Sequence, residues 1–128
     1  TCALPISFYK RDLTEHRVDS TIADGCDVKV PGEQTYEVVK HLVDEFILVT
    51  EEEIEHAMKD LMQRAKIITE GAGALPTAAI LSGKINNKWL EDKNVVALVS
   101  GGNVDLTRVS GVIEHGLNIA DTSKGVVG

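Results

Sequence analysis

The sequence predicts an α/β fold: a partial, incomplete three-layer domain in which helices cover a parallel sheet. Residues 94–100 are β-branched or apolar almost throughout, with no polar alternation. A strand of this kind is buried on both faces, which is typical of parallel sheets. Apolar residues at helical spacing recur on either side of the strands, so the predicted order is helix, strand, long helix, helix, strand, helix. A sheet of so few strands is not stable by itself. Either the domain is small, or more strands lie upstream in a longer parent chain.

The first part of the chain is predicted to be irregular. Residues 7–34 show no sustained period and carry turn formers such as Asp24-Gly25 and Pro31-Gly32, which indicate a structured loop with one short helix. Residues 1–6 fit no element that follows, and we interpret them as a non-native lead-in and exclude them from the fold. A native irregular segment is the alternative. The predicted domain covers residues 7–116, and residues 117–128 are a tail or truncated linker.

A helix is predicted next, capped by Thr35 and carrying an apolar stripe that ends at Val43. Residues 46–49 form a short, entirely apolar run that is consistent with a buried strand.

The clearest helix start in the chain follows that run. Thr50 with Glu53 three residues later makes a capping box, and the helix is expected to run to about Ile68. A second helix, rich in small residues, is predicted over 74–81 and ends at Ser82-Gly83-Lys84. After the strand at 94–100, a last amphipathic helix is expected from about Asp105 to Gly116.

Composition limits the classes of function. The 43% hydrophobic and 26% charged residues describe an ordinary globular chain, and the net charge of −7 without a Lys/Arg run argues against nucleic-acid binding. No apolar run reaches the ~20 residues of a membrane span. The two cysteines, Cys2 and Cys26, form no disulfide framework, and no metal-ligand spacing exists. This usage is consistent with a reducing cytoplasm.

The end of the strand at 94–100 is the first candidate site, because ligands bind beyond the carboxyl ends of parallel strands. Ser100 offers a hydroxyl that can donate and accept, and Gly101-Gly102 lets the backbone approach a ligand closely. The alternative is an ordinary tight turn.

Glu70-Gly71-Ala72-Gly73-Ala74 is the second candidate. It is no dinucleotide fingerprint, since it follows no strand and has no third glycine, and a helix C-cap with close packing is the alternative. The carboxylate of Glu70 lies between apolar and small residues and needs a partner or a shifted pKa, unless it faces solvent. Residues 21–25 end in Asp-Gly, ordinarily a turn. The four histidines are scattered and are interpreted as solvated side chains.

The order and spacing of these segments closely resemble the C-terminal part of the threonine dehydratase and serine racemase family. The resemblance covers Ser7 to Gly116 and rests on five segments, of which Ser-Gly-Gly-Asn-Val-Asp is fairly specific: 21–25, 36–43, 49–54, 69–74 and 98–106. It implies a fold type II enzyme, similar to the tryptophan synthase β-subunit, with pyridoxal 5'-phosphate held between two α/β domains.

The resemblance also implies an activity and a set of cofactor-binding residues. The activity is loss of water and then ammonia from L-threonine or L-serine, giving 2-oxobutyrate or pyruvate, in a cytoplasmic homo-oligomer. In the family, the residue at Ser100, beside Gly101, bonds the pyridine nitrogen. The position of Glu70 lies beside the ring, and the glycine at Gly25 brings backbone against the ring edge.

The departures from the family pattern limit what this chain is expected to do. The family's Schiff-base lysine belongs to a Ser-Phe-Lys motif without counterpart here; Lys10, Lys66 and Lys84 have the wrong context. The glycine-rich phosphate loop and the Asn loop are also absent. The chain is therefore predicted to be a fragment with no catalytic residue, inactive alone. Two alternatives remain: a serine racemase-type enzyme, and a small non-catalytic α/β ligand-binding module.

Overall fold

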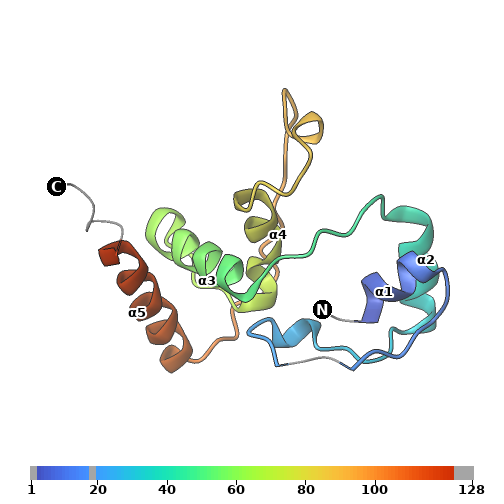
Figure 1. Cartoon of the computed structure of the whole chain (residues 1–128), viewed down its shortest axis with the longest axis horizontal. Coiled ribbons are helices and arrows are strands. Elements are labelled where there is room, and N and C mark those ends of the chain that lie inside the picture. Colours follow the sequence, from blue (N-terminus) through green and yellow to red (C-terminus); the bar gives the residue numbers. More distant parts are fainter. Residues whose placement is uncertain (1–2, 18–19, 123–128) are drawn as a thin grey trace.

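The computed structural model describes residues 3–17 and 20–122, with side chains up to His115. Helix α3 lies at the centre and packs against both α4 and α5, whereas α1 and α2 pack against each other at one end of the molecule (Figure 1). An extended segment, 43–50, joins this pair to α3. The α-helices are α1 (Ala3–Lys10), α2 (Glu33–Leu42), α3 (Glu51–Asp60), α4 (Gly71–Leu81) and α5 (Leu106–Thr122).

The core forms where α3, α4 and α5 meet. Helix α3 buries three apolar side chains at helical spacing, and α4 meets them with alanines, whose small size lets the two helix backbones come close. The buried residues of this cluster are Ala23, Ile54, Ala57, Met58, Ala74, Ala78 and Val112. Because Ala23 belongs to the same cluster, the core ties the turn before Gly25 to α4.

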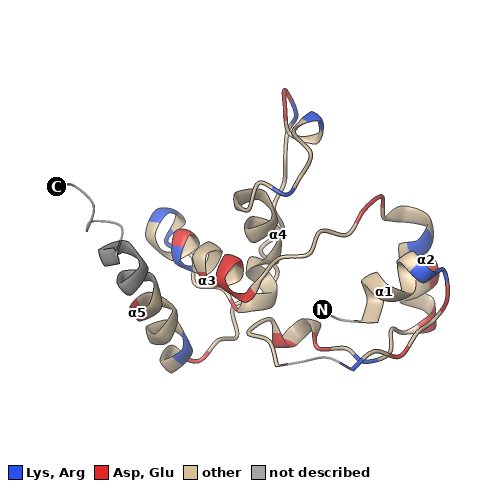
Figure 2. Cartoon of the chain, in the orientation of Figure 1, with Lys and Arg blue, Asp and Glu red and all other residues tan. Residues whose placement is uncertain are grey.

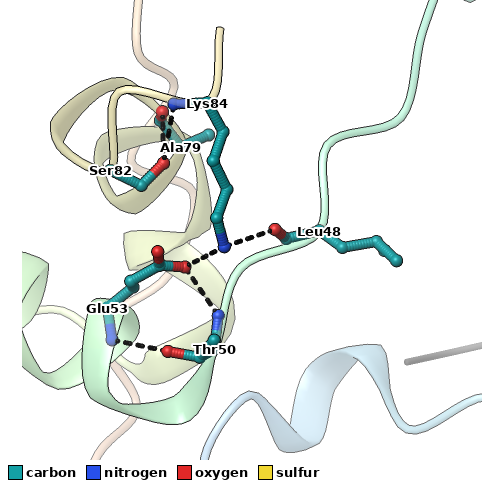
Figure 3. Close-up of polar contacts among 6 residues, drawn as sticks. All are labelled: Leu48, Thr50, Glu53, Ala79, Ser82 and Lys84. Carbon is teal, nitrogen blue, oxygen red and sulfur yellow. Dashed lines mark hydrogen bonds and ion pairs between the residues drawn. The ribbon is translucent and has the colours of Figure 1, made fainter.

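The start of α3 has the capping box that the sequence predicts (Figure 3). The Glu53 backbone N–H donates to Thr50 Oγ1 over 3.3 Å, and the Glu53 carboxylate accepts from the Thr50 N–H over 2.8 Å. Lys84 Nζ reaches the same carboxylate over 2.7 Å and the Leu48 carbonyl over 3.0 Å. The hydrogen bond from Lys84, followed by that from Thr50, lowers the pKa of Glu53.

Helix α3 ends earlier than predicted. Its last turn widens into a π-helical turn over Leu61–Ala65, and Lys66 then takes the left-handed conformation with φ 60°. The apolar residues Ile67 and Ile68, which suggested that the helix continues, lie beyond this reversal. The left-handed residue stops the helical hydrogen bonding.

Helices α2 and α4 both begin before their predicted first residues. Helix α2 starts at Glu33 with Gly32 as its N-cap, so Thr35 lies within the helix and does not cap it. Helix α4 starts at Gly71, not Ala74, with Glu70 as its N-cap. In both cases the three residues before the predicted first helical residue are helical.

The two ends of the chain also differ from expectation. Residues 3–6, which we interpret from the sequence as a non-native lead-in, lie in α1, where Ala3 is buried and donates to the Val28 carbonyl over 3.0 Å. Helix α5 begins at Leu106 as expected but passes Gly116 and ends at Thr122. A glycine inside a helix lowers its stability without necessarily ending it. Residues 123–128 of the predicted tail lie outside the described part.

The predicted sheet is not present within the described residues. Segments 46–49 and 94–100 are extended but are assigned to no strand. The side chains of Leu48, Val96 and Leu98 are 56%, 88% and 70% exposed, although apolar. An extended chain becomes a strand only when a neighbour supplies hydrogen-bond partners, and here none does.

Among the helices described, none is both long enough and apolar enough to cross a membrane.

Candidate functional site

The predicted turn after residue 100 lies against the start of α4. The Gly101 carbonyl accepts a hydrogen bond from the Glu70 N–H over 3.1 Å and another from Thr69 Oγ1 over 2.6 Å. Two segments about thirty residues apart in sequence are therefore joined through the backbone of Gly101. Ser100, immediately before it, is exposed.

Two glycines permit this close approach. A Cβ on Gly101 would overlap the Glu70 carboxylate, and a Cβ on Gly73 would lie 2.7 Å from the Gly101 carbonyl oxygen. Real Cβ atoms do not come that close to backbone oxygens. The Ser-Gly-Gly and Gly-Ala-Gly strings therefore form one contact, in which each lacks side chains where the other approaches.

Gly25 also lies close to the Glu70 carboxylate. It sits in a short 3-10 helix, Asp24–Cys26, that packs against α4. A Cβ on Gly25 would be 3.8 Å from Glu70 Oε1 and 3.1 Å from the Ala72 Cβ. The structure thus brings two of the predicted site residues, Gly25 and Gly101, close to the carboxylate of a third, Glu70, and Ser100 precedes Gly101 in the chain.

A clamp that the sequence analysis missed holds the turn of Gly25. The Glu51 carboxylate accepts from the Thr21 hydroxyl over 2.6 Å and from the Ile22 N–H over 2.7 Å. Arg108, in the first turn of α5, lies 3.6 Å from the Asp24 carboxylate and donates to the Ile22 carbonyl over 3.4 Å. In the sequence, the acidic first turn of α3, red in Figure 2, indicates only the start of a helix. No local pattern indicates that the Glu51 carboxylate also accepts hydrogen bonds from Thr21 and Ile22.

A polar pocket of about 230 Å³ opens beside Glu70, between the starts of α4 and α5. Its walls carry three carboxylates, one guanidinium and one amide. The lining residues are Asp24, Glu70, Gly71, Asn103, Val104, Asp105 and Arg108. Within the described part of the chain, no cluster of three or more His, Cys, Asp or Glu side chains is arranged to hold a metal ion.

The side chain of Ser100 is exposed to solvent. Its backbone is tied through Gly101, while no hydrogen bond among the described residues reaches its hydroxyl. Such a group can donate to or accept from a bound molecule without first breaking an internal bond. The candidate groups are therefore a hydroxyl on Ser100, a carboxylate on Glu70 and exposed backbone at Gly25.

Comparisons with known proteins identify relatives of this chain. The sequence model of a family described as "Pyridoxal-phosphate dependent enzyme" matches residues 3–101. The chain is 99% identical over 122 residues to the L-threonine dehydratase catabolic TdcB of Staphylococcus aureus (strain bovine RF122 / ET3-1), covering 95% of this chain and 35% of that protein. It is 52% identical to the TdcB of Escherichia coli (strain K12), covering 81% of this chain and 31% of the relative. This chain thus spans about one third of the curated relatives that it matches.

A solved structure gives the same picture in three dimensions. Maize serine racemase superposes with a TM-score of 0.75 at 32% identity, over 88% of this chain and 36% of the racemase chain. The arrangement of helices around Glu70 and Gly101 therefore follows that of a longer structure.

Proposed function

The chain belongs to the family of pyridoxal-phosphate dependent enzymes, and we propose that it is the C-terminal part of a threonine and serine dehydratase within it. The complete enzyme removes water and then ammonia from L-threonine to give 2-oxobutyrate, and from L-serine to give pyruvate. The observation that carries the proposal is the convergence of Gly25, Glu70 and Gly101 beside Ser100, in a chain nearly identical to a catabolic threonine dehydratase.

The residues at the site fit pyridoxal 5'-phosphate. A flat aromatic ring needs backbone that no Cβ covers, and Gly25 is exposed, with its α-carbon facing toward the Glu70 carboxylate. A pyridine nitrogen needs one hydrogen-bond partner, and the Ser100 hydroxyl is exposed at the border of the site. Both requirements are met by backbone and side chains that the helices α3, α4 and α5 hold in place.

Each of these residues has a separate task. Ser100 holds the pyridine nitrogen through its hydroxyl, and a neutral hydroxyl does not keep that nitrogen protonated as a carboxylate would. Glu70 would lie beside the ring, Gly25 would let backbone meet the ring edge, and Gly101 leaves room for the Glu70 carboxylate. When bound, the cofactor supplies an electron sink for the pair left on the substrate α-carbon.

The lysine that binds the cofactor covalently as a Schiff base is assigned to the rest of the enzyme. Among the described residues, no lysine lines the pocket beside Glu70: Lys84, for example, bonds Glu53 at the far end of α4. We propose that the extended segments 46–49 and 94–100 are strands of a parallel sheet in the complete enzyme. That enzyme is proposed to be a cytoplasmic homo-oligomer acting on small amino acids.

The proposal predicts a sharp difference between this chain and the complete enzyme. The purified chain with pyridoxal 5'-phosphate and L-threonine should form 2-oxobutyrate no faster than the cofactor alone, because an amine to bind the cofactor covalently is required. The full-length enzyme should form it readily, and its Ser100→Ala variant should lose at least about tenfold in cofactor affinity. Formation of 2-oxobutyrate by the chain alone would contradict the assignment of the Schiff-base lysine to the rest of the enzyme.

Serine racemization is the second candidate, favoured by the superposition on maize serine racemase. It needs a base on the opposite face of the substrate, supplied by the rest of the enzyme. Incubating the full-length enzyme with L-serine and measuring both D-serine and pyruvate separates the two outcomes. We expect pyruvate to dominate; D-serine as the main product would replace dehydration by racemization.

A further inference from the structure

Thr69 is a buried polar residue that the proposed roles do not use. Its side chain is 1% exposed, and its hydroxyl oxygen lies 2.6 Å from the Gly101 carbonyl and 3.1 Å from the Glu70 carbonyl. A hydroxyl has one proton and donates it to one acceptor at a time. The shorter contact identifies the Gly101 carbonyl as the main acceptor.

The hydrogen bond from Thr69 completes the coordination of that carbonyl. The Glu70 N–H supplies the other hydrogen bond over 3.1 Å, so both lone pairs of the Gly101 oxygen are used. Gly73 packs on the same residue so tightly that a Cβ there would be 2.7 Å from the Gly101 oxygen and 3.0 Å from its nitrogen. The peptide plane that carries the Gly101 carbonyl is therefore held by two hydrogen bonds.

Ser100 is restrained in a different way. Its side chain is exposed, and among the described residues its hydroxyl has no internal hydrogen bond to orient it. Ser100 and Gly101 share one planar peptide unit, so the position of the Ser100 Cα is tied to that of Gly101. The place at which the Ser100 side chain leaves the backbone thus depends in part on the contacts that hold Gly101.

We propose that Thr69 is a positioning residue: by bonding the Gly101 carbonyl, it aims the Ser100 hydroxyl at the pyridine nitrogen of the cofactor. This rests on the role proposed for Ser100 above. A hydrogen bond weakens steeply as its angle departs from linear, so a small rotation of the turn changes cofactor binding. Thr69 needs no contact with the cofactor to have this effect.

The test uses the full-length enzyme that contains this segment. Thr69→Val keeps the shape of the side chain and removes the donor, whereas Thr69→Ser keeps the donor. Thr77→Val on α4 is the matched control, because within the described part of the chain no hydrogen bond links Thr77 to Gly101. Two readouts are measured: the dissociation constant for pyridoxal 5'-phosphate added to apoenzyme, and the pH profile of the bound cofactor's absorbance.

Thr69→Val is expected to raise the dissociation constant about tenfold and to shift the absorbance profile in the same direction as Ser100→Ala. Thr69→Ser should stay within about twofold of the parent, and Thr77→Val should match it. Thr69→Cys keeps the size and weakens the donor, so it should show the same shift to a smaller degree. It serves as the second variant if Thr69→Val does not fold.

Two results overturn the inference. One is a Thr69→Val enzyme that is less stable but unchanged in both readouts, which makes Thr69 structural only. The other is a Thr69→Ser enzyme as impaired as Thr69→Val, which removes the role of the hydroxyl. If Ser100→Ala also changes neither readout, the role proposed for Ser100 itself fails; if Ser100→Ala changes both and Thr69→Val neither, only the positioning role fails.

Discussion

Gly73 shows how a single residue type decides whether the site can form. Helix α4 meets the Gly101 backbone at this position, and any side chain would enter space that Thr69 and Gly101 already fill. Taken alone, the same string in the sequence favours a helix C-cap followed by close packing. The contact between Gly73 and Gly101 distinguishes a helix cap from packing against a distant segment. A cap makes its hydrogen bonds within the same helix end, whereas this packing needs a residue about thirty positions away.

Gly73→Ala is therefore expected to destabilise the chain by about 1–3 kcal/mol, since backbone atoms rather than flexible side chains must move. Equilibrium unfolding in urea measures this. Gly111→Ala is the matched control: Gly111 lies in α5, and a Cβ there would meet nothing within 4 Å. It should be neutral or stabilise by up to about 1 kcal/mol, through helix propensity. Equal losses in both variants would argue against the tight contact at Gly73.

The candidate site could be predicted residue by residue only where chemistry and resemblance agreed. Ser100, Glu70, Gly25 and Gly101 were identified, and the structure brings the last three around one carboxylate. Thr69, Glu51 and Arg108 were not identified. Each acts through a partner about thirty or more residues away, and such partners leave no local pattern in the sequence.

At the scale of elements, the start of α3 is the best determined feature. The capping box forms as predicted, and Lys84 adds a third contact that connects the end of α4 to the start of α3 (Figure 3). The hydrogen bond from Lys84 is the largest cause of the lowered pKa of Glu53. A carboxylate whose folded pKa is lowered stabilises the fold while ionised.

The sign of this linkage gives a pH prediction. The contribution of Glu53 is fully present above the ordinary glutamate pKa of about 4.3 and is lost as the pH falls through its lower folded pKa. Thermal unfolding between about pH 7 and pH 2.5 should therefore show a drop on the acid side that is smaller in Glu53→Gln. Lys84→Met should reduce the drop by removing the largest cause. An unaltered acid-side drop in both variants would contradict the linkage.

Helix boundaries were less well predicted than helix existence. Helices α2 and α4 each start earlier than predicted, α3 ends earlier, and α5 runs past Gly116. Tertiary packing sets these limits: α4 can start at Gly71 because the Ile22 backbone packs where a side chain would otherwise stand. Propensity alone places a boundary only to within a few residues.

At the scale of the whole molecule, the main feature of this chain is the apolar surface that it exposes to solvent. Leu48, Val96 and Leu98 are exposed on extended segments whose residue types favour burial in a sheet. The chain spans about one third of its relatives, so surface that would be covered in the complete enzyme is expected to be open here.

The isolated chain should therefore bind a dye that fluoresces on exposed apolar surface, under conditions where its helices are intact. A Val96→Thr, Leu98→Thr double variant should bind less dye without losing helical circular dichroism, because both side chains point to solvent rather than to the core. An unchanged helical signal with no dye binding in the parent chain, and cooperative unfolding, would instead favour a self-sufficient binding module.

The sequence by itself determined the helices from residue 33 onward, the capping box of α3 and the family, because these depend on local periodicity and on short motifs. The tertiary structure decided where the helices end, how Gly25, Glu70 and Gly101 meet, and how Thr69 and Gly73 restrain the turn after Ser100. It also left segments 46–49 and 94–100 extended and unpaired. The physical reason is the same in each case: backbone contacts and strand pairing depend on residues far away in the chain.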